Sequence, residues 1–166
     1  IGFDGYAIGG LSVGETKEEM YSVVHHIAVK MPAQKPRYLM GVGDPEDLLE
    51  GIEAGVDMFD CVMPTRNARN GQLFTFDGKM NIRNSIFKSD FSPIDDKGLS
   101  TMSETYTKAY LHHLFKTEEI LGYRIATQHN LRFYILLMKT IQNEIQKGNF
   151  ESWSKEFIVR YNSNNT

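Results

Sequence analysis

The sequence has a single cysteine, Cys61, no run of eighteen apolar residues and no strong charge imbalance. One cysteine excludes an internal disulfide framework and cannot alone hold a structural zinc ion. Without a long apolar run, no membrane-spanning helix is expected. The net charge of −3 indicates no particular partner. The 166 residues are 41% hydrophobic and 23% charged, which is typical of a globular chain and not of a disordered, collagen-like or coiled-coil one.

Charge is distributed unevenly along the chain. Residues 1–62 carry eleven acidic and four basic side chains, whereas residues 63–91 carry five basic and two acidic ones, a local net charge of +3. Two interpretations of this basic segment stay open. It is an ordinary solvated loop, or it contacts a polyanion whose phosphates the basic side chains neutralise.

The first 62 residues alternate between short apolar segments and amphipathic ones. Strands are predicted at residues 4–8, 37–40 and 56–62, and helices at residues 16–29 and 45–54. Thr16 with Glu19 fits a capping box, and Asp44-Pro45 fits a helix N-terminus. The alternation predicts parallel strands with crossover helices. Three strands are fewer than an open α/β sheet or a barrel normally has, so the sheet looks truncated on its N-terminal side.

The remaining residues follow a different pattern. A hairpin is predicted over residues 73–83, with Asp77-Gly78 as a type I′ turn. Residues 84–103 are polar and irregular, and the tail from residue 162 onward is expected to fray. Helical periodicity predicts three further helices, at residues 104–115, 127–147 and 150–161.

Each predicted strand of the first part ends in residues suited to a ligand site. These ends are Gly9-Gly10, Gly41-Val42-Gly43 and Asp60, and ligands of parallel α/β folds bind at the carboxyl ends of the strands. Asp60 is either a salt-bridged strand-end residue or a nucleophile or general acid–base. Cys61 should face the opposite side of the strand as a core thiol.

Two arginines follow Asp60 closely, at positions 66 and 69 of a predicted loop over residues 64–71. The guanidinium fork suits a phosphate, so the segment fits a polyanionic substrate with chemistry at the sugar. The alternative is that these arginines pair with the acidic first third of the chain. His129, near the start of the long predicted helix, is by itself more typical of a capping or core histidine than of a metal ligand.

Three segments, residues 3–15, 37–43 and 57–71, resemble the bacterial form of the queuosine-pathway tRNA-guanine transglycosylases, and the resemblance extends over essentially all 166 residues. It implies an α/β fold that is the C-terminal part of a TIM-type (β/α) barrel, with an inserted, normally zinc-binding subdomain and C-terminal helices. The expected domains are the last three β/α units, the hairpin with the zinc-type subdomain, and the closing helices, at residues 1–72, 73–130 and 131–166.

The resemblance also implies an activity, the exchange of the wobble guanine of certain tRNAs for a deazaguanine base. Asp60 matches the nucleophile that attacks the ribose anomeric carbon. The residues matching the base-binding segments are Gly9, Gly10, Leu11, Met40 and Gly41. Those matching the tRNA-contacting loops are Gly41, Val42, Gly43, Asp44, Pro45, Glu46, Asp47, Thr65, Arg66, Asn67, Ala68 and Arg69. The implied partners are a tRNA anticodon stem-loop, the deazaguanine base and a second copy of the chain, in the cytoplasm and without a membrane.

The sequence departs from the family in two respects. The family's second catalytic aspartate lies in an N-terminal half that is absent here, so the 166-residue chain alone is expected to be inactive. The family's zinc ligands, three cysteines and a histidine, match Gly98, Ser100, Ser103 and His129, so the expected Zn²⁺ should not bind properly. A non-catalytic tRNA-binding or dimerisation subunit of the same family is the alternative, although retention of the segment from Asp60 to Gly71 argues against it.

Overall fold

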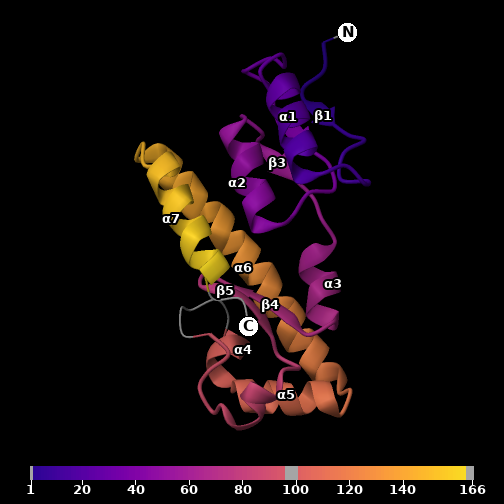
Figure 1. The fold of residues 1–166 in the computed structure, drawn as a ribbon, viewed down its shortest axis with the longest axis vertical. Coiled ribbons are helices and arrows are strands. Elements are labelled where there is room, and N and C mark those ends of the chain that lie inside the picture. The colour runs from indigo at the N-terminus through magenta and orange to yellow at the C-terminus, as the bar shows by residue number, and fades with distance from the viewer. Residues whose placement is uncertain (1, 96–100, 164–166) are drawn as a thin grey trace. The chain divides into compact units, whose positions relative to one another are not determined.

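The computed structural model describes residues 2–95 and 101–163. The chain divides into two compact units, Ile1–Met63 and Pro64–Thr166. Figure 1 colours the first indigo to magenta and the second magenta to yellow. None of the helices in these two ranges is long and apolar enough to cross a membrane.

The first unit contains a parallel sheet, as predicted. Its strands β1 (Tyr6–Ile8), β2 (Arg37–Leu39) and β3 (Met58–Phe59) lie in the order β1-β2-β3. Helices α1 (Lys17–Ala28) and α2 (Pro45–Glu53) form the crossovers between them. The third strand is shorter than the predicted segment 56–62, because only Met58 and Phe59 pair with β2. The α/β class is confirmed, whereas the barrel and the zinc subdomain stay predictions.

The two faces of this sheet differ in burial. Ile8 and Leu39 point into a core that includes Met20 and Val24 of α1. The opposite face carries Ala7, Tyr38 and Met58, which pair across the strands in register. These three residues line a shallow hollow of about 250 Å³, and Met58 is 53% exposed. This face of the sheet is therefore open, and the residues that follow the strands lie at its edge.

Local sequence signals set the helix ends of the first unit. Thr16 and Glu19 form the predicted capping box at the start of α1. Asp44 accepts a hydrogen bond from the Glu46 N–H at the start of α2, whose first residue is Pro45. Gly55 follows this helix with φ +96°, a left-handed conformation that favours glycine.

The second unit consists of a hairpin surrounded by helices. The hairpin strands are β4 (Gln72–Thr75) and β5 (Gly78–Asn81), and the helices are α3 (Met63–Arg69), a 3₁₀ helix (Ser85–Ser89), α4 (Thr101–Thr105), α5 (Lys108–Lys116), α6 (Ile120–Gln146) and α7 (Phe150–Ser163). Helices α6 and α7 run side by side (Figure 1). The unit has its own core, in which Phe74 stacks on Phe133 at 5.9 Å between ring centroids.

Three predictions for the second unit were wrong in detail. Thr75 pairs with Gly78, so the hairpin turn is centred on residues 76–77 and not on Asp77-Gly78. The only non-glycine residues with positive φ among those described are Ser12 and Glu118, which excludes a type I′ turn here. The predicted helix 104–115 is two helices, with Thr107 capping the second. Helix α6 begins seven residues before the predicted Thr127.

The predicted loop over residues 64–71 is largely helical, because α3 spans Met63–Arg69. Pro64 lies in its first turn, where a missing N–H costs no helical hydrogen bond. Ala68 is fully buried in the core of the second unit. The two arginines therefore lie on a short helix that packs through its small residues.

Candidate active site at the carboxyl edge of the parallel sheet

Asp60 lies just past β3, at the edge of the sheet where all three strands end, and its side chain is exposed. Its Oδ1 atom accepts two hydrogen bonds, from the Tyr38 hydroxyl at 2.6 Å and from the Gly41 N–H at 2.9 Å. Both donors come from β2 and the turn after it. One carboxylate oxygen is thus held, and Oδ2 stays available at the surface of the first unit.

The strand register explains this contact. Tyr38 pairs with Met58, and Asp60 is two residues further along, so all three side chains project from one face of the sheet. Gly41 adopts φ +76°, a conformation that glycine takes without strain. This turn directs its N–H at the carboxylate.

The same two donors set the charge of the site. The Tyr38 hydroxyl, followed by the Gly41 N–H, lowers the pKa of Asp60 from its ordinary value of 3.8. In return, the Asp60 carboxylate raises the pKa of the Tyr38 hydroxyl. Asp60 is therefore an anion held by a neutral phenol, which is the state that a carboxylate nucleophile requires.

The predicted base-binding residues come together at this edge. A Cβ on Gly9 would lie 3.3 Å from the Met40 sulfur, so the ends of β1 and β2 are neighbours. Met40 is 45% exposed, and Gly10 adopts φ +78°. Leu11 is partly buried against the core of the first unit. The arrangement leaves backbone groups of the glycine turns near Met40 and Asp60, as a flat ligand would need.

Most of the predicted tRNA-contacting segment 41–47 is engaged within the first unit. Val42 is 2% exposed and belongs to the core. Gly43 packs on Cys61, since a Cβ at residue 43 would lie 2.4 Å from the Cys61 Cβ. Cys61 is half-buried and accepts a hydrogen bond from the Met63 N–H at 3.2 Å. A buried residue such as Val42 is not accessible to a tRNA, so a tRNA would contact the exposed residues beside it.

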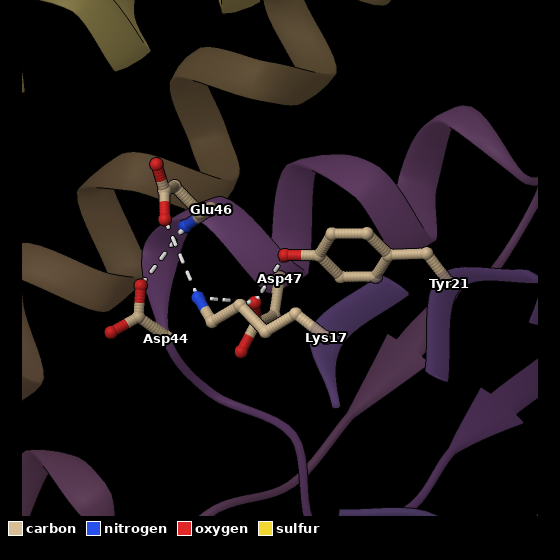
Figure 2. Close-up of polar contacts among 5 residues, drawn as sticks. All are labelled: Lys17, Tyr21, Asp44, Glu46 and Asp47. Carbon is tan, nitrogen blue, oxygen red and sulfur yellow. Dashed lines mark hydrogen bonds and ion pairs between the residues drawn. The ribbon is translucent and has the colours of Figure 1, made fainter. Parts of the chain in front are cut away.

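The acidic residues of that segment connect α2 to α1. The ammonium group of Lys17 in α1 lies 2.8 Å from Asp47 and 3.3 Å from Glu46, and Figure 2 shows these contacts. The Tyr21 hydroxyl donates to Asp47 at 2.6 Å, and burial together with this carboxylate raises the pKa of Tyr21. Asp44 caps α2 (Figure 2). These contacts give the carboxylates a structural role in joining α2 to α1 and in capping α2.

The arginines of α3 are exposed, as a phosphate contact requires. Arg66 and Arg69 are three residues apart and so lie on one side of the helix. Asn67 donates to Gln72 at 2.7 Å and fixes the helix to β4. Arg69 also lines a shallow groove along α6 with two arginines that the sequence reasoning missed, Arg124 and Arg132. Their spacing of eight residues on a long helix could have indicated that they lie on similar sides of that helix.

His129 is fully buried in the second unit. Its Nε2 atom lies 2.8 Å from the Phe74 carbonyl oxygen, and its Nδ1 atom lies 2.8 Å from the Ser103 hydroxyl. Gly98 and Ser100, the other positions that match the zinc ligands, lie outside the described residues. The described ranges contain no group of three or more histidine, cysteine or acidic side chains placed to hold a metal ion.

Tyr38 is the site residue that the sequence reasoning missed. Its aromatic ring on a short strand reads as an ordinary half-buried position. The available signal was strand parity: once the strands are parallel and in register, residues 38, 58 and 60 share a face. Tyr38 can therefore be recognised as a site residue only when the pairing of the strands is known, because the strand pattern of the sequence is not enough.

Comparison with known proteins gives one consistent result. Residues 1–163 match the family model described as queuine tRNA-ribosyltransferase. A queuine tRNA-ribosyltransferase of Francisella tularensis subsp. novicida (strain U112) is 56% identical over 161 residues, which are 97% of this chain and 44% of that protein. One from Shewanella halifaxensis (strain HAW-EB4) is 56% identical over 159 residues, 96% of this chain and 42% of that protein. The chain spans less than half the length of these relatives.

Proposed function

Because the chain belongs to the queuine tRNA-ribosyltransferase family, we propose that it is part of a tRNA-guanine transglycosylase and that Asp60 is its nucleophile. The proposed reaction exchanges a wobble guanine for a deazaguanine base. The observation that carries the proposal is the Asp60 carboxylate, ionised and held through one oxygen by Tyr38 and Gly41 at the carboxyl edge of the sheet.

The chemistry has two displacements at one carbon. In the first, Oδ2 of Asp60 bonds to the ribose anomeric carbon, the bond from that carbon to guanine N9 breaks, and guanine leaves with its electron pair and takes up a proton. In the second, a ring nitrogen of the incoming base bonds to the same carbon, loses its proton, and displaces the carboxylate. A covalent intermediate divides one difficult substitution into two easier ones.

The residues around Asp60 support distinct roles. Tyr38 and Gly41 hold Oδ1, which orients Oδ2 and keeps the carboxylate charged. Gly9, Gly10 and Met40 border the same edge, where a flat base could approach backbone groups closely. Leu11 and Gly41 complete the proposed base site.

The proposed polynucleotide contact rests on the exposed arginines of α3. Arg66 and Arg69 offer guanidinium forks to backbone phosphates of a tRNA anticodon stem-loop. Ala68 is buried and Asn67 bonds Gln72, so these two residues hold the helix in place. A tRNA contact at Thr65, Asn67 and Ala68 stays a prediction. The segment 41–47, a homodimer and a cytoplasmic location also stay predictions.

The direct test is trapping of the covalent intermediate. In the protein that carries this chain, Asp60→Asn should form no tRNA adduct that survives denaturing electrophoresis, because an amide is not a nucleophile of comparable strength. Asp57→Asn is the matched control, an exposed aspartate three residues earlier. An adduct of wild-type yield in Asp60→Asn would contradict the assignment.

Base exchange also separates the enzyme from the binding-subunit alternative. The 166-residue chain and a chain of the relatives' full length should be compared with labelled guanine and tRNA. Exchange by the longer chain that is abolished by Asp60→Asn supports the transferase. Binding of tRNA without exchange in both chains supports the non-catalytic subunit.

A further inference from the structure

The zinc that the family implies does not fit the donors this chain offers near His129. Zinc in a structural site takes four cysteine, histidine or carboxylate ligands, and a serine hydroxyl is a poor substitute. The described donors are the His129 ring, the Ser103 hydroxyl and Asp95, a buried carboxylate whose charge acts on His129. Moreover, the hydroxyl is 2.8 Å from the ring nitrogen, whereas two light-atom ligands of one tetrahedral zinc lie about 3.3 Å apart at ordinary bond lengths.

We propose that a direct hydrogen bond from Ser103 to His129 takes the structural place of the metal, and that this subdomain is stable without zinc. The link joins α4 to α6 through two residues that are 26 positions apart in the sequence. It depends on the described residues alone and is independent of the proposed transferase activity.

The proton positions follow from the partners. The Phe74 carbonyl oxygen can only accept, so His129 carries its hydrogen on Nε2 and donates it there. Nδ1 of a neutral ring is then an acceptor, and the Ser103 hydroxyl donates to it. Both ring nitrogens are satisfied in a fully buried position, which a buried polar group requires.

One half of this arrangement is what a metal-binding histidine also needs. Such a histidine usually donates its other ring N–H to a carboxylate, a backbone carbonyl or a water, which fixes its orientation. Here the Phe74 carbonyl takes that role, while a hydroxyl stands where the metal would bind the other nitrogen. Among the described residues, the outer support of a metal site is present and a group of three or more metal-binding side chains is not.

The neighbouring contacts show that α6 is attached to the hairpin by side chains. Asn130 accepts a hydrogen bond from the Phe74 N–H at 3.0 Å. His129 and Asn130 thus bind both polar backbone groups of Phe74. Hydrogen bonds of His129 thus link α6 to both α4 and the hairpin.

Metal content and metal dependence provide the first test. The purified protein, dialysed against zinc and then desalted, should hold fewer than about 0.1 zinc per chain by elemental analysis, against about one for a structural site. Its Tm should be the same with and without EDTA. About one tightly held zinc per chain, together with a Tm lowered by EDTA, would overturn the proposal.

A pair of serine variants provides the second test. Ser103→Ala removes the donor to a buried nitrogen and should lower the Tm by roughly 2–8 °C. Ser154→Ala is the matched control, because Ser154 is also a buried serine but donates to the Glu151 carbonyl of its own helix. Equal shifts in the two variants would refute the link.

Nuclear magnetic resonance of the unaltered protein avoids the risk that a variant fails to fold. Nitrogen-15 spectra should show His129 neutral at pH 7, with its hydrogen on Nε2 and an unprotonated Nδ1 that accepts a hydrogen bond. Loss of that bond in Ser103→Ala should change the Nδ1 chemical shift. A hydrogen on Nδ1, or a shift that responds to added zinc, would contradict the assignment.

Discussion

Tyr38 donates to Oδ1 of Asp60 at 2.6 Å, and this one hydroxyl is the first cause of the lowered Asp60 pKa. A donor to a carboxylate stabilises the charged form, so its removal must raise the pKa. Tyr38→Phe should therefore move the Asp60 pKa upward, toward its ordinary value of 3.8. The Gly41 N–H stays in place, so the shift should be partial.

The consequence for activity has a defined sign. The wild-type carboxylate stays ionised to a lower pH than an ordinary aspartate, and the variant should lose its anion at higher pH. The rate of adduct formation should therefore begin to fall at a higher pH in the variant than in the wild type. The carbon-13 resonance of the Asp60 carboxyl should show a titration that moves upward by the same amount. Tyr6→Phe, on the neighbouring strand, is the control. If Tyr38→Phe leaves the titration of Asp60 unchanged, Tyr38 does not position the Asp60 carboxylate.

At the level of elements, one amide makes three of the hydrogen bonds that attach α6 to the hairpin and to α3. Asn130 accepts from the Phe74 N–H and donates to the carbonyl oxygens of Pro64 and Gln72, all within 3.0 Å. Asn130→Leu leaves these buried backbone groups without that partner. We expect a loss of about 2–4 kcal/mol in the free energy of unfolding.

Urea unfolding monitored by circular dichroism measures this loss. Asn143→Leu is the control, since Asn143 is exposed on the same helix. The control should change the free energy of unfolding by less than about 0.5 kcal/mol. Similar values for both variants would show that the three hydrogen bonds contribute nothing net.

The α3 helix should contribute to tRNA binding through charge. Arg66→Ala and Arg69→Ala should each reduce the slope of log affinity against log salt by about one, if each arginine neutralises one phosphate. Binding of tRNA between about 50 and 200 mM salt measures the slope. Lys147→Ala is the control, because Lys147 is already paired with Glu144 at 2.7 Å. Slopes that stay at the wild-type value would remove α3 from the RNA contact.

Features that depend on residues close in the sequence were predicted well, whereas features that depend on long-range contacts were not. The Thr16–Glu19 capping box is formed as predicted because all its atoms lie within four residues. The hairpin turn was misplaced because the pairing of Thr75 with Gly78 decides it. The early start of α6 reflects packing of Ile125 and Ala126 in the core, which periodicity from Thr127 onward could not indicate.

The candidate site shows the same division. Asp60 and the glycine turns were predicted because strand ends can be read from the sequence. Tyr38 and the bond from Ser103 to His129 were not predicted. The first requires the strand register, and the second requires the approach of two residues that are 26 positions apart. Arg66 and Arg69 were predicted in a loop and lie on a helix, and their contact with a polyanion stays a prediction.

For the molecule as a whole, the two compact units should differ in stability. The sheet of the first unit has strands of three, three and two residues, and its Ala7–Tyr38–Met58 face is open. A parallel sheet is normally covered on both faces. The second unit instead surrounds a core in which Phe74, Phe133 and Ile125 are fully buried.

Hydrogen exchange can test this difference in the 166-residue chain. Opening free energy follows buried contacts, so buried amides of α1 should exchange at least about tenfold faster than those of α6. Mass spectrometry of peptides covering residues 17–28 and 120–146 measures both in one sample. Equal protection would show that the open face does not weaken the first unit. If the longer chain of the family covers this face, its addition should slow exchange in residues 17–28, because α1 packs on that sheet.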